Sequence, residues 1–493
     1  MSRALLAGSV ALLLAIMGIA VHDMRADPGP GGHAAELVPA SALAFARLDT
    51  DPADPAARRL DGLAPKLPGY SAARDAALKA VSPTAGAFDL QRDVRPWLGD
   101  EAAAALVDLG GGRFGSLVIA SVRDEPKAEA LLQRVGGARP ATRYRDAVVR
   151  RFGGGNAAAF VSGFLVAGPE LAVQRSIDVA RGDAPALAKA SAFERALAGV
   201  RRPAELYVAP RGLRAASGGV AGTIAALLDQ PGLRAVGAAA AADGRGLRIR
   251  ARSVGTGKPR GTVSALAARV PAGAIAMLAA PDASAAAAAA GRVGGAGVLD
   301  SVRGVLSSEA SLDADHDLLG RLKGFTAWIA TGAAAPVIGF AAHTDDPQGL
   351  REVLARIQDP VARALAADPD APGAFDSKEI AGVDAFTLRV SDGFQPTYAI
   401  SGDTVVAATD PRAVGAFLTR GGARLTATAA FRAAIPSIPT GIESLGFFDV
   451  RQLLTLGEQT GLTAEDLRPV RAASAVIQRE EDDTTAELFF EIP

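Results

Sequence analysis

The hydrophobic pattern of the chain begins with a long uncharged run. After Arg3, residues 4–21 contain no charged side chain, and the run ends at His22 before a spacer rich in proline and glycine at residues 28–32. A helix of about 18 residues is about 27 Å long, close to the roughly 30 Å of a bilayer's hydrocarbon core. We therefore expect residues 1–36 to form a membrane segment followed by a flexible spacer.

The flanks of this run predict its orientation and its fate. Arg3 lies on the short leading side, which favours a body outside the cytoplasm. The run is longer than the about 7 to 15 apolar residues of a typical signal peptide, which favours an uncleaved anchor. A cleaved signal and a secreted body are the alternative, because Gly18 and Ala20 offer a small-x-small cleavage site.

The apolar segments that follow occur twice in the same order. Three features match at nearly constant separations of 232, 239 and 238 residues: Val38 to Ala42 with Val270 to Ala274, Ser162-Gly163 with Ser401-Gly402, and Phe193 with Phe431. Each Val-Pro-Ala segment opens a short apolar strand. Ser-Gly between apolar runs is typical of a two-residue hairpin. Self-similarity of this kind predicts an internal duplication.

Strands that lead into helices also recur. A helix is predicted to begin at Pro126 and again at Pro347, each after an aspartate that can cap it. Proline is tolerated in the first turn because its missing N–H would be unpaired there. Glycine triplets at 110–112 and 153–155 lie between short strands, which predicts hairpin turns and not phosphate-binding loops.

These patterns together predict an α+β fold made of two tandem diverged copies. Each copy should be a mostly antiparallel sheet with helices packed on one face, because hairpins dominate and helices lie between them. We expect the first copy at residues 37–255 and the second at 263–493, with a boundary near residues 255–261, a stretch of glycine, lysine, proline and arginine.

Charge separates the two copies. Residues 37–255 contain 30 Lys and Arg against 21 Asp and Glu, whereas residues 263–493 contain 18 against 29. The first copy is therefore basic and the second acidic, although the whole chain is close to neutral. The basic copy follows the membrane segment, so contact with anionic lipid is one interpretation. Docking of oppositely charged copies, or a diffuse solvated surface, is the other.

Composition excludes several chemistries. The chain has no cysteine, which rules out disulfides, thiolate nucleophiles and cysteine-bound zinc. Two Trp and four Tyr provide few stacking platforms, which lowers the expectation of a sugar ligand and argues against a nucleic-acid partner. A G-x-S-x-G nucleophile elbow is missing, and Gly255 to Lys258 lacks the upstream glycine of a phosphate loop.

Histidine is scarce and offers little for catalysis. His22 and His33 lie in the leader and spacer, and His343 follows an apolar strand, where we expect a surface residue at the strand end. His316 lies among Asp313, Asp315 and Asp317, a set that could furnish a divalent-cation site. The calcium-loop pattern requires glycine at its sixth position and an acid at its twelfth, but this chain has Leu318 and Gly324 there. We therefore expect a solvated acidic loop.

The opening of the body carries a family resemblance. The segment Leu37 to Phe45, with sequence LVPASALAF, is followed by Asp51-Pro52 and preceded by an apolar leader. It resembles a bacterial family of uncharacterised membrane-anchored extracytoplasmic proteins, and the likeness spans roughly residues 36–493. The resemblance implies a location at the cell envelope and a two-part body, and it transfers no functional residue.

Three functions are compatible with these features. The leading hypothesis is a non-catalytic, membrane-tethered binding or interaction protein of the cell envelope. One alternative is a carrier that holds a lipid or another amphiphile against its sheets. Another is a carboxylate-dependent hydrolase, which needs two close acids in a cleft. The sequence designates no catalytic, cofactor-binding or metal-binding residue, and we expect no cofactor.

Overall fold

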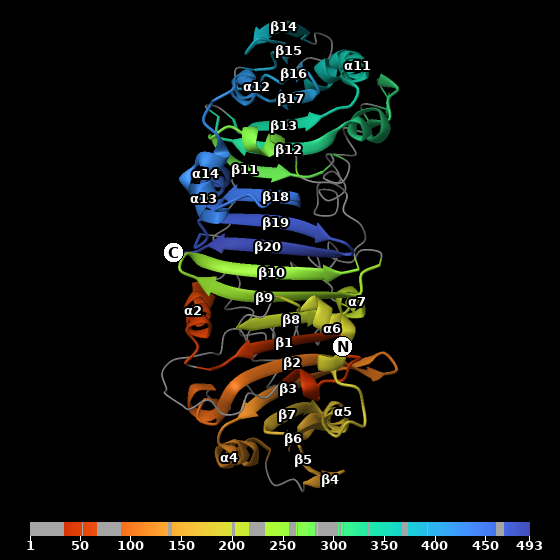
Figure 1. Ribbon diagram of the computed structural model, residues 1–493, viewed down its shortest axis with the longest axis vertical. Helices are drawn as coiled ribbons and strands as arrows, with labels where there is room; N and C mark the ends of the chain where they lie inside the picture. Colours follow the sequence, from red (N-terminus) through yellow and green to blue (C-terminus); the bar gives the residue numbers. More distant parts are fainter. Residues whose placement is uncertain are drawn as a thin grey trace. The chain divides into compact units, whose positions relative to one another are not determined.

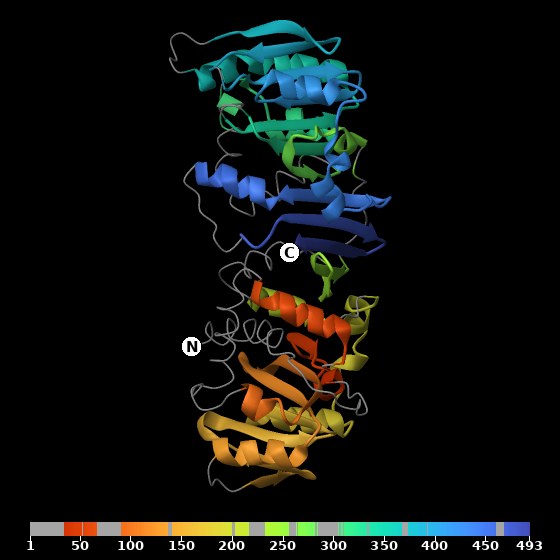
Figure 2. The ribbon, with the colours of Figure 1, turned by 90° about the vertical axis from the view of Figure 1, so that its left-hand side faces the viewer.

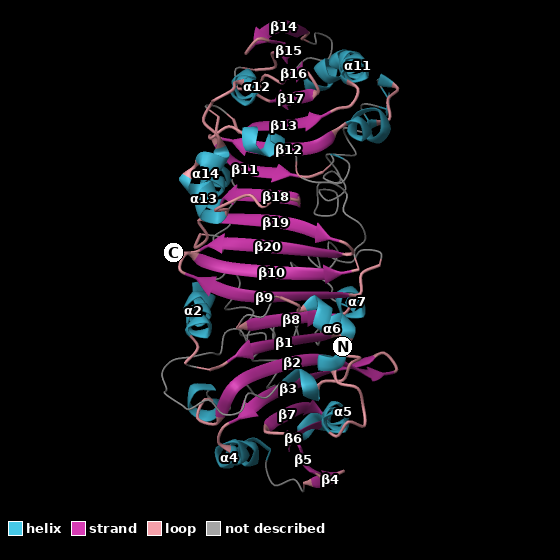
Figure 3. Cartoon of the chain, viewed as in Figure 1, coloured by secondary structure: helices cyan, strands magenta, loops and turns pink. Residues whose placement is uncertain are grey.

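The computed structural model describes residues 34–51, 53–66, 90–136, 141–199, 203–215, 232–255, 263, 265–281, 283, 304, 307–308, 310–332, 335–366, 373–391, 393–459 and 468–493. The contacts divide the chain into two compact units. Unit 1 comprises Met1–Gly257, Asp482–Thr485 and Ile492, and unit 2 comprises Lys258–Glu481, Ala486–Glu491 and Pro493. Strands predominate in both units (Figure 3).

Unit 1 is built on a sheet whose strands pair in the order β4-β5-β6-β7-β3-β2-β1-β8-β9-β10, with antiparallel neighbours. Figure 1 shows this order. The strands are β1 (Ala44–Asp49), β2 (Leu98–Gly110), β3 (Arg113–Val122), β4 (Thr142–Tyr144), β5 (Ala147–Arg151), β6 (Asn156–Val161), β7 (Phe164–Pro169), β8 (Ala204–Val208), β9 (Ala235–Asp243) and β10 (Gly246–Val254). The helices are α2 (Pro55–Leu63), α4 (Glu125–Gly136), α5 (Glu170–Ala180), α6 (Ser191–Ala196) and α7 (Pro210–Ala215). Figure 2 shows α2 in red beside the strands of this unit.

Unit 2 pairs its strands in the order β14-β15-β16-β17-β13-β12-β11-β18-β19-β20. The strands are β11 (Ala274–Ala279), β12 (Lys323–Ala330), β13 (Val337–His343), β14 (Phe375–Ile380), β15 (Val383–Leu388), β16 (Thr397–Ser401), β17 (Thr404–Ala408), β18 (Ile442–Asp449), β19 (Ala472–Glu480) and β20 (Asp483–Glu491). The helices are α11 (Pro347–Leu365), α12 (Pro411–Leu418), α13 (Ala429–Ala434) and α14 (Val450–Gln459). The predicted α+β class and the antiparallel pairing are confirmed.

The predicted turns and caps are confirmed as well. Residues 110–112 join β2 to β3 with positive φ angles of 87°, 59° and 75°, a conformation that glycine adopts without strain. Residues 153–155 connect β5 to β6. The Asp124 carboxylate accepts a hydrogen bond from the Lys127 N–H, and Asp346 accepts one from the Gly349 N–H, so each caps the helix that follows.

Helices cover both faces of the unit 1 sheet, so the expectation of helices on one face is wrong. Val173 and Ile177 of α5 share a core with Ala157 and Ala159, whereas Ala128 of α4 packs with Ala158 on the opposite face. The physical reason is the composition of β6, which is apolar on both faces. If helices covered only one face of the sheet, the apolar side chains of β6 on the other face would be exposed to water.

The core of unit 2 contains several large aromatic side chains. Trp328 stacks on Phe417, with ring centroids 5.2 Å apart and an interplanar angle of 5°. Phe431 of α13 packs against Phe447 of β18. These rings and Met277 are buried, which identifies the sheet face that α12 and α13 cover.

The predicted membrane segment at residues 4–21 and most of its spacer lie outside the described residues, as do His22 and His33. Within the described ranges, no helix has the length and apolar character needed to span a bilayer. The first described turn, Ala34–Leu37, packs into the core of unit 1.

Candidate functional site

The sheet of unit 2 has a second face that is apolar and partly exposed to solvent. Leu278 lies opposite Gly446 and Ala327, and Phe448 lies opposite Ala276. Directly paired residues point to the same side of a sheet. This alignment defines the open face, made of Ala276, Leu278, Ala327, Ile329, Ile338, Phe340, Gly446, Phe448, Ala473 and Ala475.

Three large side chains on the open face are strongly exposed. Leu278 is 42% exposed, Phe448 is 40% exposed and Ile338 is 56% exposed, whereas Met277 and Phe447, their sequence neighbours on the other face, are buried. Every member of the open face has an apolar side chain or none. The backbone groups are paired in the ladder, so the surface formed by these residues offers mainly apolar contact, with the hydroxyl of Ser444 two positions before Gly446 on β18.

The matching positions of unit 1 differ in size and burial. Ala46 precedes Leu278 by 232 residues, the separation that also relates Val38 to Val270, and it is buried beside Ala104. At this position, therefore, a small side chain is buried in unit 1 and a larger one faces solvent in unit 2. Exposed large side chains that share one face are typical of binding surfaces.

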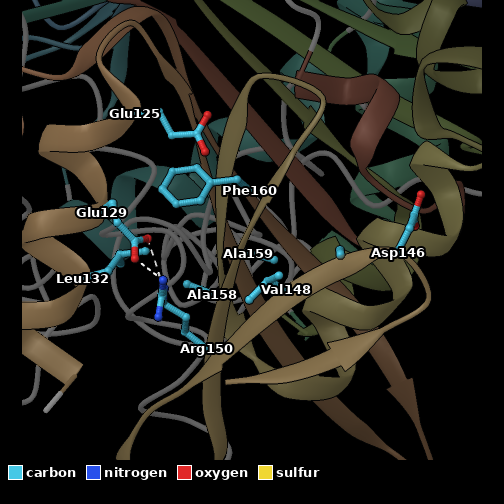
Figure 4. A pocket seen from close by; sticks show the side chains of 10 residues that line it. Glu125, Glu129, Leu132, Asp146, Val148, Arg150, Ala158, Ala159 and Phe160 are labelled. Carbon is cyan, nitrogen blue, oxygen red and sulfur yellow. Dashed lines mark hydrogen bonds and ion pairs between the residues drawn. The ribbon is translucent and has the colours of Figure 1, made fainter. Parts of the chain in front are cut away.

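A pocket of about 340 Å³ lies in unit 1 between α4 and the strands β5 and β6 (Figure 4). Its apolar lining includes Leu132, Val148, Ala158 and Phe160. The charged residues that line it are Glu125, Glu129, Asp146 and Arg150. The register of β5 and β6 explains why Arg150 and Ala158 are neighbours, since they pair directly across the two strands.

Ion pairing neutralises part of this lining. Arg150 donates from Nε to Glu129 Oε2 at 3.1 Å and from Nη2 to Oε1, and Gln133 donates to the same Oε1 at 3.0 Å. A hydrogen bond from Arg181 holds the pKa of Asp146 below its usual range. Among the described residues, no side chain forms an ion pair with Glu125.

A carboxylate-dependent hydrolase needs two close acids in a cleft, and this pocket contains Glu125 and Glu129. Glu125 and Glu129 are one helical turn apart and both line the pocket. However, hydrogen bonds from Arg150 and Gln133 occupy the oxygens of Glu129. A general base needs an oxygen free to reach a substrate proton, so this arrangement favours a structural role for Glu129.

The acidic segment around His316 forms a self-contained turn. Oδ1 of Asp313 accepts hydrogen bonds from the N–H groups of Asp315 and His316, and the Asp313 N–H donates to Asp317 Oδ2 at 2.9 Å. These bonds use the carboxylates to cap the backbone. In the part of the chain that the structure describes, no group of three potential ligands is placed to hold a metal ion.

The other sequence candidates also have structural positions. His343 ends β13, as predicted, with Nδ1 3.4 Å from Asp403 Oδ2. Gly255 follows β10, while Lys258 lies outside the described residues. The Val-Pro-Ala segments make isolated β-bridges, Pro39 with Ala186 and Pro271 with Arg424. The motif that carries the family resemblance therefore stabilises each unit.

Neither surface was identified from the sequence. The open face has one sequence signal, since β11 reads AIAMLA without the polar alternation of a half-exposed strand. That pattern normally indicates burial on both faces, which is wrong for Leu278. The pocket depends on Arg150 and Glu129, which are 21 residues apart, and no local motif joins them.

Comparison with known proteins identifies a family whose function is not known. A family model described as "Protein of unknown function (DUF3352)" matches residues 4–479. No curated protein matches the sequence. Crystal form IV of TP0453 is 11% identical with a TM-score of 0.26, covering 46% of this chain and 81% of TP0453. Crystal form I is 9% identical with a TM-score of 0.26, covering 47% and 92% respectively.

Proposed function

The chain belongs to the DUF3352 family of unknown function, and on that premise we propose that it is a non-catalytic, membrane-tethered binding protein of the cell envelope. Its ligand in this proposal is the hydrocarbon chain of a lipid or similar amphiphile, held on the open face of unit 2. The observation that carries the proposal is the exposure of Leu278, Ile338 and Phe448 on one uncharged sheet surface.

The chemistry of the open face favours hydrocarbon over a polar ligand. A sugar, nucleotide or peptide backbone needs hydrogen-bonding partners, and unpaired polar groups placed against this face would lose their water without compensation. A hydrocarbon chain has no polar groups, so it loses no hydrogen bonds with water when it binds this face. Each methylene that it buries contributes about 0.8 kcal/mol.

The dimensions of the open face also suit an extended chain. Strands are roughly 4.8 Å apart, so the five strands from β13 to β19 span about 19 Å. α11 packs beside this surface, where Leu350 and Leu354 cluster with Phe340. One side of a bound hydrocarbon would therefore meet a helix that is already in place.

The location of the protein is part of the same proposal. The uncharged run at residues 4–21 would anchor the chain, with its body outside the cytoplasm. The net positive charge of residues 37–255 would then add contact with anionic lipid headgroups. Co-sedimentation of the protein without residues 1–33 with anionic vesicles at low salt, and not with neutral vesicles, would support the headgroup contact. Equal sedimentation with both would refute it.

Descent of the two units from one ancestral unit is also proposed, and their topology supports it. β1 pairs with β2 and β8, as β11 pairs with β12 and β18. The remaining strands follow in equivalent order in each unit. Matching turns and capped helices add to this support. On this proposal the open face is a feature that one copy acquired after duplication.

Titration with a fluorescent fatty acid tests the binding proposal. cis-Parinaric acid fluoresces in apolar surroundings, and we expect saturable binding to the purified full-length protein. Leu278→Thr and Phe448→Thr should each raise its Kd about tenfold, because a buried Leu or Phe contributes about 1.5 to 3 kcal/mol and 1.4 kcal/mol is a factor of ten. Both residues are exposed, so folding should be retained.

A matched control keeps this test specific. Ile438 is also an exposed aliphatic residue of unit 2, at 38%, but it lies outside the open face. Ile438→Thr should leave the Kd unchanged. An unchanged Kd in both open-face variants, or no saturable binding by the wild type, would refute the proposal.

A further inference from the structure

Unit 1 contains a second candidate binding site, the pocket between α4, β5 and β6. It lies in a different unit from the open face, and its lining combines apolar and charged side chains. We propose that this pocket binds a small organic cation, an ammonium group attached to a short apolar chain. The inference does not depend on lipid binding by unit 2.

The corresponding region of unit 2 has larger side chains at the equivalent positions. Ala158 pairs with Arg150 on β5 and with Ala167 on β7, and Tyr398 pairs in the same way with Phe386 on β15 and Ala407 on β17. Two aromatic rings thus occupy the places of an alanine and an arginine.

Those aromatic side chains pack closely in unit 2. Phe386 and Tyr398 stack with ring centroids 5.1 Å apart, and Gln358 of α11 donates a hydrogen bond to the Tyr398 hydroxyl at 2.7 Å. The side chain of Ala158, in contrast, ends at Cβ, and the Arg150 side chain is hydrogen-bonded to Glu129. The difference in side-chain volume explains why unit 1 has space between helix and sheet at this position.

The charge of the pocket selects the sign of its ligand. Arg150 neutralises Glu129, and Arg181 neutralises Asp146. Glu125 remains as the charge without an ion-pair partner among the described residues. An anionic ligand would be repelled by Glu125 and would compete with Glu129 for Arg150, whereas a cation gains from the carboxylate.

The apolar lining selects the rest of the ligand. Glu125 and Phe160 both line the pocket, and Figure 4 shows the Phe160 ring pointing to the side from which Glu125 enters. An ammonium group near this carboxylate can also lie against the face of the ring, which adds a cation–π attraction. Leu132, Val148 and Ala158 then provide contacts for a short alkyl chain.

Three probes of equal chain length test this site in the full-length protein. Hexylammonium, hexanol and hexanoate differ in charge, and saturation-transfer NMR and calorimetry can measure their binding. We expect saturable binding of hexylammonium, weaker binding of hexanol and none of hexanoate. Binding of hexanoate as tight as that of hexylammonium would overturn the proposal, as would failure of hexylammonium to bind.

Two variants locate the binding. Ala158→Phe places a ring where unit 2 has Tyr398 and should weaken hexylammonium binding at least tenfold. Glu125→Gln changes an exposed residue and should weaken hexylammonium about fivefold while leaving hexanol unchanged. The matched control is Glu352→Gln, at an exposed glutamate of α11. Equal effects of Glu125→Gln and Glu352→Gln would refute the inference, even if Ala158→Phe failed to fold.

Discussion

The main-chain N–H of Leu187 donates a hydrogen bond to the carbonyl oxygen of Val38, with an N to O distance of 2.7 Å. Both residues are fully buried in the core of unit 1. Unit 2 has the same bond between Leu425 and Val270, at 2.9 Å. The Val-Pro-Ala segment that precedes the first strand of each unit is therefore held by a short turn about 150 residues later in the chain.

Leu187→Ala should destabilise unit 1 strongly. The substitution leaves the backbone hydrogen bond possible but creates a cavity, which typically costs about 2 to 5 kcal/mol for a buried leucine. Urea unfolding followed by circular dichroism measures the loss. Leu171→Ala is the control, because Leu171 is partly exposed and should change the free energy of unfolding by much less. Similar losses in the two variants would contradict the structural role of this turn.

Gly339→Ala should destabilise unit 2 through a steric clash. A Cβ atom at this position would lie 2.3 Å from the indole ring of Trp328, which itself stacks on Phe417. The ring cannot move without disturbing that stack, so we expect a loss of about 1 to 3 kcal/mol. Thermal unfolding with tryptophan fluorescence measures the change.

Gly446→Ala is the control for this substitution. Gly446 lies on β18 of the same unit, and its Cβ would meet the nearest atom at an ordinary distance of 3.6 Å. We expect it to be tolerated without a large change in Tm. If both alanine variants had the same Tm, the clash with Trp328 would not be the cause.

Asp49→Asn should stabilise the protein at neutral pH. Burial raises the pKa of Asp49 above its usual 3.8, so the folded state disfavours the charged carboxylate. An acid with a raised pKa lowers stability above its folded pKa, and this penalty disappears as the pH falls to about 3.8. Asparagine keeps the acceptor for the Asp51 N–H. We expect a gain of roughly 0.5 kcal/mol at pH 7 and none at pH 3.

Asp410→Asn should lower the stability of the protein at neutral pH, and this loss should disappear at low pH. The hydrogen bond from the Arg412 side chain lowers the pKa of Asp410, so its charge contributes stability above the unfolded pKa of about 3.8. That contribution is lost as the pH falls through the lower folded pKa. Thermal unfolding from pH 3 to 7 compares both variants with the wild type. Parallel pH profiles for the two variants would contradict the opposite pKa shifts of Asp49 and Asp410.

Local patterns in the sequence were sufficient to predict several turns and helix caps. The glycine triplet at 110–112, Ser162-Gly163 and the capping aspartates Asp124 and Asp346 act over a few residues, and each has the predicted position in the structure. Turn and cap preferences depend on the φ angles and hydrogen bonds of adjacent residues, which is why a sequence can indicate them.

Tertiary structure alone decided which apolar side chains are exposed and where a pocket lies. Met277 and Leu278 are adjacent and both apolar, yet one is buried and the other is exposed, because helices cover one face of the sheet at that strand. Arg150 meets Ala158 and Glu129 only through strand pairing and the packing of α4. Space between helix and sheet depends on the sum of side-chain volumes from separate segments, and no single segment of the sequence contains that sum.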